Sequence, residues 1–353
     1  MDIERPTALV TGGAGFIGGE LIDRLLGAGE HHVACVDKLT YSANRSRLAA
    51  QIKKGLEFHP IDVADADDLD AIVATSRPTV IFHLAAESHV DRSIDRPGPF
   101  IETNVVGTLN LLQSALKLWR SMEPATAERF RLVHVSTDEV FGSAPAGTMF
   151  DETTRYDPRS PYSASKAAAD HLVRAWHATY GLPSIVTTTC NNYGAFQFPE
   201  KLIPHSVVRA LSGDAIPVYG DGLHIRDWIH VSDHVAGLIA AATHGSPGSS
   251  YLFGGRNPIA NLALVERICS ILDDVAPAPT SYRSRIEFVA DRPGHDRRYA
   301  IDPTRAEHTL GWQAQTDFDH GLREVVTWYA DNERWWRNIM SAGYRTDRLG
   351  AAR

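Results

Sequence analysis

The sequence predicts an α/β fold, in which a doubly wound parallel sheet is followed by a smaller, mixed C-terminal domain. Three observations lead to this prediction: the length, an alternation of apolar runs with helical patterns, and a change of rhythm after Asn191. The chain has 353 residues, 43% hydrophobic and 22% charged. That composition is ordinary for globular proteins, and the length suits two domains of roughly 100–200 residues each.

The first unit of the predicted sheet is built around a glycine-rich turn. A short apolar strand over Thr7–Val10 leads into the glycines, and helical periodicity follows over Phe16–Ala28. Gly29 suits a helix end. The next strand, His32–Val36, ends at Asp37. A strand, glycine turn, helix and strand in this order are typical of Rossmann-type dinucleotide-binding units.

The alternation continues to about residue 190. Further strands are predicted at Leu56–Asp62, Pro78–Leu84, Arg131–Ser136 and Ser184–Thr189, and further helices at Asp65–Thr75, Gly98–Arg120 and Tyr162–Tyr180. Strands that alternate with helices are joined by right-handed crossovers and therefore run parallel.

After Asn191 the segments become shorter and prolines punctuate them. We predict a dinucleotide-binding domain over residues 1–190, with a return of the chain near 224–245, a smaller mixed domain over 191–330, and a C-terminal tail over 331–353. The pair Trp335–Trp336 in this tail is interpreted as a packing or interface anchor.

Charge and cysteine content exclude several classes of function. With 35 basic and 43 acidic residues the net charge is −8, so no nucleic-acid partner is expected. Cys35, Cys190 and Cys269 lie far apart, which excludes a dense disulfide scaffold. An acidic start, Met1–Pro6, does not resemble a secretory signal, and no apolar run reaches the ~18 residues of a membrane span. We expect a soluble, cytoplasmic protein.

The glycine turn has the pattern Gly12-x-x-Gly15-x-x-Gly18. Such a turn lets the backbone approach a pyrophosphate at the N-terminus of the following helix. An acid at position 37 accepts hydrogen bonds from a ribose 2′-hydroxyl and repels a 2′-phosphate, which favours NAD over NADP. The positive charge of Lys38 is the one local feature against this preference.

Two further motifs carry reactive side chains. Tyr162 and Lys166 are four residues apart and share a helix face, so the ammonium is expected to lower the pKa of the phenol and make it a base. Asp138 and Glu139 follow a strand at the edge where open α/β sheets bind ligands. They can serve as an acid and a base if their pKa values differ, or else simply cap a helix.

Together these motifs resemble an extended short-chain dehydrogenase/reductase. Over about residues 7–330 the chain closely resembles the dTDP-glucose 4,6-dehydratases. This resemblance rests on Asp37–Tyr41, Ala85–Ser93, Thr137–Glu139, Asn191–Gly194, Phe198–Pro204, Tyr219–Gly222 and Asp291–Tyr299.

The resemblance implies a role for each reactive residue. Tyr162 would take the proton of the sugar 4-hydroxyl while NAD oxidises C4, and Lys166 would hold the phenolate and the nicotinamide ribose. Glu139 would remove the C5 proton, Asp138 would protonate the departing C6 hydroxyl, and Thr137 would hydrogen-bond near O4. The product would be dTDP-4-keto-6-deoxyglucose, with water released and NAD regenerated.

The same resemblance makes residues 191–330 a nucleotide-sugar-binding domain and implies two sets of binding residues. For NAD they are Gly12, Gly15, Phe16, Ile17, Gly18, Asp37, Lys38, Leu39, Thr40, Asp62, Val63, Leu84, Ala85, Ala86, Ser88, Thr103, Tyr162, Lys166 and Asn192. For the nucleotide sugar they are Ser88, Thr137, Asn191, Lys201, Leu202, Pro217, Tyr219, Arg226, Asn261, Asp291, Arg292 and His295.

Alternative functions remain on the same fold. A nucleotide-sugar 4-epimerase or decarboxylase would share the glycine turn and the Tyr-x-x-x-Lys motif but needs no acid–base pair. Two further alternatives are a dehydratase for another nucleotide sugar and a non-catalytic NAD-binding scaffold. His224, His230 and His234 lie near two aspartates but lack a His-Glu-x-x-His pattern, so no metal is predicted. We expect a homodimer through helices 98–120 and 162–180.

Overall fold

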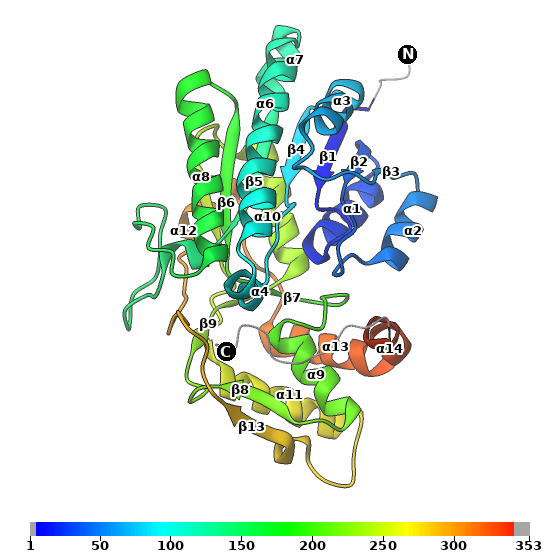
Figure 1. The fold of residues 1–353 in the computed structure, drawn as a ribbon, viewed down its shortest axis with the longest axis vertical. Helices are drawn as coiled ribbons and strands as arrows, with labels where there is room; N and C mark the ends of the chain where they lie inside the picture. The colour runs from blue at the N-terminus through cyan, green and yellow to red at the C-terminus, as the bar shows by residue number, and fades with distance from the viewer. Residues whose placement is uncertain (1–4, 342–353) are drawn as a thin grey trace.

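The computed structural model describes residues 5–341, and its main layer is a seven-stranded sheet (Figure 1). In spatial order the strands are β11 (Ser250–Phe253), β6 (Ser184–Thr189), β5 (Arg131–Thr137), β4 (Val80–His83), β1 (Thr7–Thr11), β2 (His32–Val36) and β3 (Glu57–His59). Every neighbouring pair is parallel. The predicted fold class is confirmed.

Helices cover both faces of the sheet. One face carries α3 (Ala66–Ser76), α6 (Gly107–Arg120) and α8 (Pro161–Tyr180); the other carries α1 (Phe16–Ala28), α10 (Val231–His244) and α12 (Thr304–Leu310). Side chains alternate along a strand, so Leu9 of β1 belongs to the core under α3 and α6, whereas Val10 belongs to the core under α1. Burial on both faces explains why these strands are apolar throughout.

Short elements connect the layers of this half. They are α2 (Arg45–Lys53), α4 (Val90–Asp95), α5 (Gly98–Phe100), a π-helical turn (Ile101–Val106), α7 (Pro124–Arg129) and a 3-10 turn (Asp138–Phe141).

The second half is smaller and mixed (Figure 1, lower part). Its paired strands are β7 (Asn191–Tyr193) with β10 (Trp228–His230), β8 (Ile216–Tyr219) with β13 (Ile286–Val289), and β9 (Ile225–Arg226) with β12 (Ile259–Ala260). Its helices are α9 (Leu202–Ser212), α11 (Asn261–Val275), a 3-10 turn (Tyr282–Arg285), α13 (Phe318–Asp331) and α14 (Glu333–Ser341). These elements enclose a separate apolar core that includes Ile203, Ile268 and Leu322.

The structure differs from the sequence-based expectation in three places. Helix 98–120 is interrupted by the π-helical turn, where Thr103 and Asn104 are buried and bonded to other segments. Strand β11 joins the edge of the main sheet although it lies beyond the predicted return at 224–245. The predicted tail begins with α14, whose Trp336 is buried in the second core; positions 342–353 lie outside the described residues.

Within residues 5–341, no helix combines the length and the apolar character that crossing a membrane requires.

Candidate active site

A cleft of about 640 Å³ is lined by residues from both halves of the molecule, a size typical of small-molecule sites. The cleft brings together all residues that the sequence analysis assigned to catalysis, to NAD or to the nucleotide sugar, except Leu39 and Asp291. The backbone N–H of Leu39 donates to Asp37 and its side chain packs against the core under α1. The Asp291 carboxylate pairs with two histidines, described below.

The glycine turn between β1 and α1 forms one end of the cleft. Gly12 has φ +75°, and a Cβ there would lie 2.7 Å from the Ala85 backbone N. A Cβ on Gly18 would lie 2.3 Å from the Gly12 carbonyl oxygen. Gly15 is the N-cap of α1 and offers no side-chain acceptor to the first turn. The exposed N–H groups and the absence of Cβ atoms fit the pyrophosphate of NAD.

Asp37 and Lys38 lie at the end of β2, on the same wall. The Asp37 carboxylate accepts hydrogen bonds from the Ala14 and Leu39 backbone N–H groups, at 3.0 and 2.7 Å. The Lys38 ammonium lies 3.2 Å from Asp62 and donates to the Thr103 hydroxyl at 2.8 Å. Because a carboxylate neutralises this lysine, its charge does not favour a 2′-phosphate, and the one local argument against NAD loses its force.

The acid–base pair is positioned by strand β5 and the 3-10 turn after it. Thr137 caps this turn by accepting the Glu139 N–H at 3.3 Å. Asp138 is 2% exposed, and burial, reinforced by the neighbouring charge of Glu139, raises its pKa well above the usual range. Burial also raises the pKa of Glu139, but three cations oppose this. The two carboxyls therefore differ: Asp138 is the better proton donor and Glu139 the better base.

The three cations that face Glu139 come from the second half of the chain. They are Arg292, Lys201 and Arg226. Arg226 is 5% exposed and lies 4.1 Å from the centre of the Tyr299 ring, while the Lys201 ammonium donates to the Ser88 carbonyl at 2.8 Å. A group of fixed donors in one cleft suits a diphosphate.

Tyr162 and Lys166 lie on α8 and line the same cleft. In this structure, burial works against the expected effect of the ammonium on the phenol pKa. Burial, with the nearby Glu139 charge, raises the pKa of Tyr162, and only its hydrogen bond with Thr137 opposes the rise appreciably. The Lys166 ammonium instead donates to the Val135 carbonyl at 2.8 Å. Burial lowers the pKa of Lys166 to about 8.

Glu200 is a polar residue of the cleft that the sequence analysis did not single out. Glu200 has a side chain only 4% exposed and accepts a hydrogen bond from the Tyr41 hydroxyl at 2.9 Å. Arg92 lies over the Tyr41 ring, 3.9 Å from its centre. These contacts join the loop after β2 to the loop before α9. Glu200 lies within the motif Phe198–Pro204, but its contacts could not be predicted, because its partners are distant in sequence.

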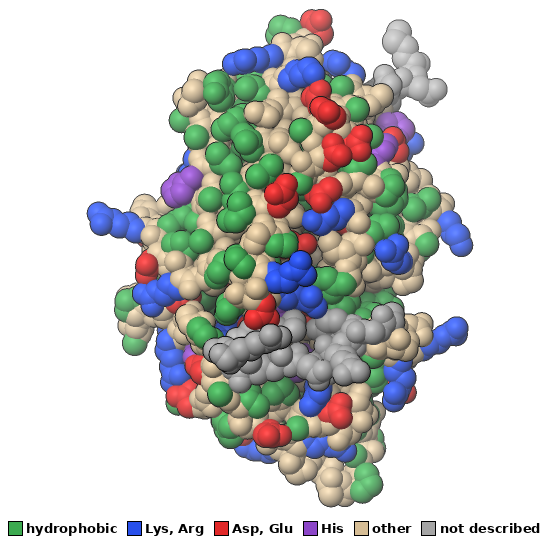
Figure 2. Space-filling view, viewed as in Figure 1, with side chains coloured by type: hydrophobic (Ala, Val, Ile, Leu, Met, Phe, Trp, Pro, Cys, Tyr) green, Lys and Arg blue, Asp and Glu red, His purple; other side chains and the backbone are tan. Residues whose placement is uncertain are grey.

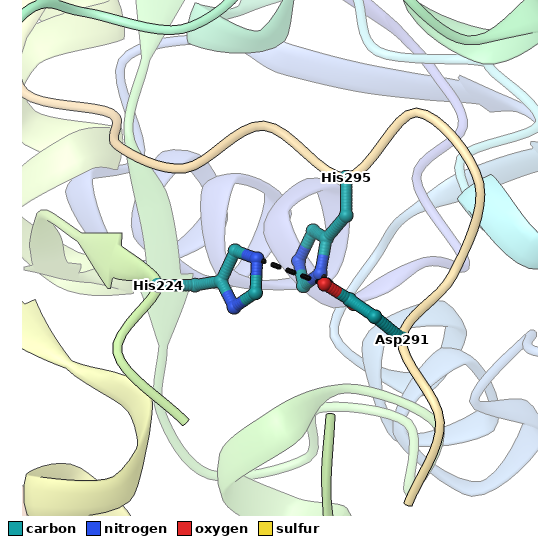
Figure 3. Close-up of side chains that lie close together, drawn as sticks. All are labelled: His224, Asp291 and His295. Carbon is teal, nitrogen blue, oxygen red and sulfur yellow. Dashed lines mark hydrogen bonds and ion pairs between the residues drawn. The ribbon is translucent and has the colours of Figure 1, made fainter. Parts of the chain in front are cut away.

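Two histidines, His224 and His295, lie beside the Asp291 carboxylate, as Figure 3 shows, and His295 also lines the cleft. The Asp291 carboxylate is 2.6 Å from His295 Nδ1 and 3.2 Å from His224 Nε2. In the described part of the chain this is the one group of three metal-binding side chains whose ligand atoms lie within 4.8 Å. However, the two rings are stacked, 3.8 Å apart and 16° from parallel. Their nitrogen lone pairs then lie in separate planes, which suits hydrogen bonds to one carboxylate better than a shared cation.

The histidines singled out in the sequence do not converge. His234 Nδ1 lies 2.8 Å from the Asn192 amide oxygen, and His230 caps α10. Each serves a separate structural contact.

Comparison with known proteins places these features in a family. The family model described as GDP-mannose 4,6-dehydratase matches residues 9–325. A dTDP-glucose 4,6-dehydratase of Neisseria meningitidis serogroup B is 48% identical over 352 residues, which cover 98% of this chain and 99% of that protein.

Solved structures are similar over the same length. A dTDP-glucose 4,6-dehydratase of Streptomyces venezuelae, solved with NAD and dTDP bound, is 42% identical with a TM-score of 0.84; the match covers 94% of this chain and 99% of that one. A UDP-glucose 4-epimerase of Thermotoga maritima, solved with UDP-glucose, is 26% identical with a TM-score of 0.82, covering 93% and 99%.

Proposed function

Because this chain belongs to the GDP-mannose 4,6-dehydratase family and, within it, to the dTDP-glucose 4,6-dehydratases, we infer that it is a lyase. It converts dTDP-glucose to dTDP-4-keto-6-deoxyglucose and water, with NAD as its cofactor. The observation that supports this reaction best is the pair Asp138–Glu139, which lines the same cleft as Tyr162. An epimerase needs no such pair, because it eliminates nothing at C5 and C6.

Each chain residue has a distinct task in the proposed mechanism. When bound, NAD takes a hydride from C4, later returns it to C6, and brings a positive charge into the cleft. Tyr162 removes the 4-hydroxyl proton. Burial raises the pKa of the phenol, so this step requires the positive charges of bound NAD and Lys166 to favour the phenolate. The resulting 4-keto group acidifies the C5 proton, and Glu139 removes it.

Elimination then needs a proton donor at C6. Asp138 protonates the departing C6 hydroxyl, since burial raises its pKa and favours the protonated carboxyl. Thr137 hydrogen-bonds near O4, and C5 is finally reprotonated. We propose that residues 191–330, apart from the elements that return to the main sheet, hold the nucleotide sugar through Lys201, Arg226 and Arg292.

Substrate choice gives the direct test. Incubation with a panel of dTDP-, UDP-, GDP- and CDP-hexoses should yield loss of one water from dTDP-glucose far faster than from the others, measured by mass spectrometry. A product of unchanged mass with inverted C4 would instead establish an epimerase. Loss of water mainly from another nucleotide sugar would establish a dehydratase of different specificity.

We propose that the enzyme forms a homodimer through α6 and α8. Figure 2 shows hydrophobic side chains gathered on the face where Figure 1 places these helices. Apolar residues, three of them alanines, line the outer side of α8: Ala164 and Ala175 are exposed, and Ala168 and Leu172 are half-buried. Small residues at this spacing let a second pair of helices approach closely. A cytoplasmic location stays a prediction from the sequence.

Sedimentation tests this dimer. The wild-type protein should sediment at twice the chain mass, and Ala175→Arg should shift it towards the monomer, because an unpaired guanidinium would be buried at the interface. Ala50→Arg is the matched control, since Ala50 is an exposed alanine on α2. A wild-type monomer, or a dimer that Ala175→Arg leaves intact, would contradict this interface.

A further inference from the structure

Near Lys166, on the side of α8 that faces the sheet, lies a buried carboxylate, that of Asp170, which has no role in the mechanism above. Asp170 is 0% exposed and lies four residues after Lys166 on α8, so it shares a helix face with Lys166 and Tyr162. His134 of β5 lies between the two charged groups. Its Nε2 is 3.1 Å from Asp170 Oδ1 and 3.4 Å from Lys166 Nζ.

Neutral donors surround the Asp170 carboxylate. The Ser136 hydroxyl of β5 donates to Oδ2 at 2.7 Å, and the Tyr156 hydroxyl donates to the same oxygen at 2.8 Å. Arg174 donates in turn to the Tyr156 hydroxyl at 2.9 Å. One buried side chain of α8 is thus bonded to the strand that ends at the acid–base pair.

Because the Lys166 ammonium is buried, it needs a negatively charged group nearby. Lys166 is 4% exposed, and its ammonium contacts the Val135 carbonyl at 2.8 Å and His134 Nε2 at 3.4 Å. Burial lowers the pKa of His134 to about 4, so the imidazole is neutral and compensates no charge. His83, whose ring centre is 5.2 Å from that of His134, is also kept neutral by burial.

We propose that Asp170 is a positioning residue. Its buried carboxylate is the counter-ion of the Lys166 ammonium and, through its contacts with His134 and Ser136, fixes the position of α8 against β5. This inference rests on the proposed function, because Lys166 matters only if Tyr162 must lose its proton. Burial alone would raise the pKa of Asp170, but its hydrogen bonds with His134 and Ser136 and the charge of Lys166 oppose this effect, and the pKa is lowered. Lys166 and Asp170 then carry opposite buried charges, and His134 Nε2 lies within 3.4 Å of both groups.

The carboxylate has opposite effects on the two reactive groups. It favours the ammonium of Lys166, but it disfavours the phenolate of Tyr162, as do the closer Glu139 and Asp138 charges. Because Lys166 is nearer, we expect the first effect to dominate. Removal of the charge should therefore deprotonate Lys166 at a lower pH and so reduce activity on the alkaline side.

The test compares Asp170→Asn, which keeps the shape and removes the charge, with Tyr156→Phe, which removes one neutral donor to the same carboxylate. Lysine is labelled with carbon-13 at Cε, and the Lys166 signal of the NAD-loaded protein is assigned by its loss in Lys166→Met. Asp170→Asn should lower the Lys166 pKa by roughly one to three units, whereas Tyr156→Phe should leave it nearly unchanged. In Asp170→Asn, the alkaline limb of the pH–rate profile should shift to lower pH together with the Lys166 pKa.

Several outcomes would overturn the proposal. One is a Lys166 signal in Asp170→Asn that titrates at the wild-type pH, and another is an equal shift in Tyr156→Phe. If Asp170→Asn does not fold, the carbon-13 Cγ signal of Asp170 in the wild-type protein decides, because a neutral carboxyl at neutral pH refutes a counter-ion. The lysine titration needs no turnover, so failure of the dehydratase assay on the wild-type protein is distinguished from failure of this inference.

Discussion

Replacement of Tyr162 by phenylalanine should abolish oxidation at C4 and lower product formation from dTDP-glucose by about 10²–10⁴-fold, the usual contribution of a positioned acid–base group. Phenylalanine keeps the packing, since the Tyr162 ring meets Phe100 edge to face at 6.3 Å. It lacks the oxygen that accepts the 4-hydroxyl proton. With substrate deuterated at C4, mass spectrometry should find the label still at C4.

A matched control lies on the same helix. Tyr180 is 42% exposed, and Tyr180→Phe should leave turnover at the wild-type rate. Should Tyr162→Phe process dTDP-glucose as fast as this control, the phenol does not act as the base. The mechanism would then need another group to take the 4-hydroxyl proton.

Replacement of Glu139 by glutamine should separate oxidation from elimination. The amide keeps the shape and some hydrogen bonding but cannot accept a proton from C5. We expect a sugar nucleotide two hydrogens lighter than dTDP-glucose to accumulate, with water loss slowed by about 10²–10⁴-fold. In deuterium oxide, C5 of the recovered sugar should gain almost no label.

The neighbouring variant gives the complementary pattern. Asp138→Asn removes the proton donor at C6 and keeps the base, so C5 should exchange with solvent while water loss remains slow. If both variants exchange C5 equally, the division of labour between the two carboxyls is incorrect. If Glu139→Gln loses water at the wild-type rate, Glu139 is not the base.

Much of this enzyme can be predicted from its sequence because the signals are local. The alternation of strands and helices, the glycines at 12, 15 and 18, and the spacing of Tyr162 and Lys166 each depend on residues within one or two turns. Such periodicities specify elements and the chemistry carried on them. The family followed from several of these motifs together, and the relatives confirm it.

Other features were decided only when distant segments came together. The sequence placed a lysine beside Tyr162, but folding buried the phenol next to Glu139 and raised its pKa. It left the charge of Lys38 as an argument against NAD, and folding set Asp62 against that charge. No local pattern predicted strand β11, the contact of Glu200 with Tyr41, or the contact of Asp170 with His134. Burial and Coulomb interactions depend on neighbours in space, so the tertiary structure alone sets the charge state of each group in the cleft.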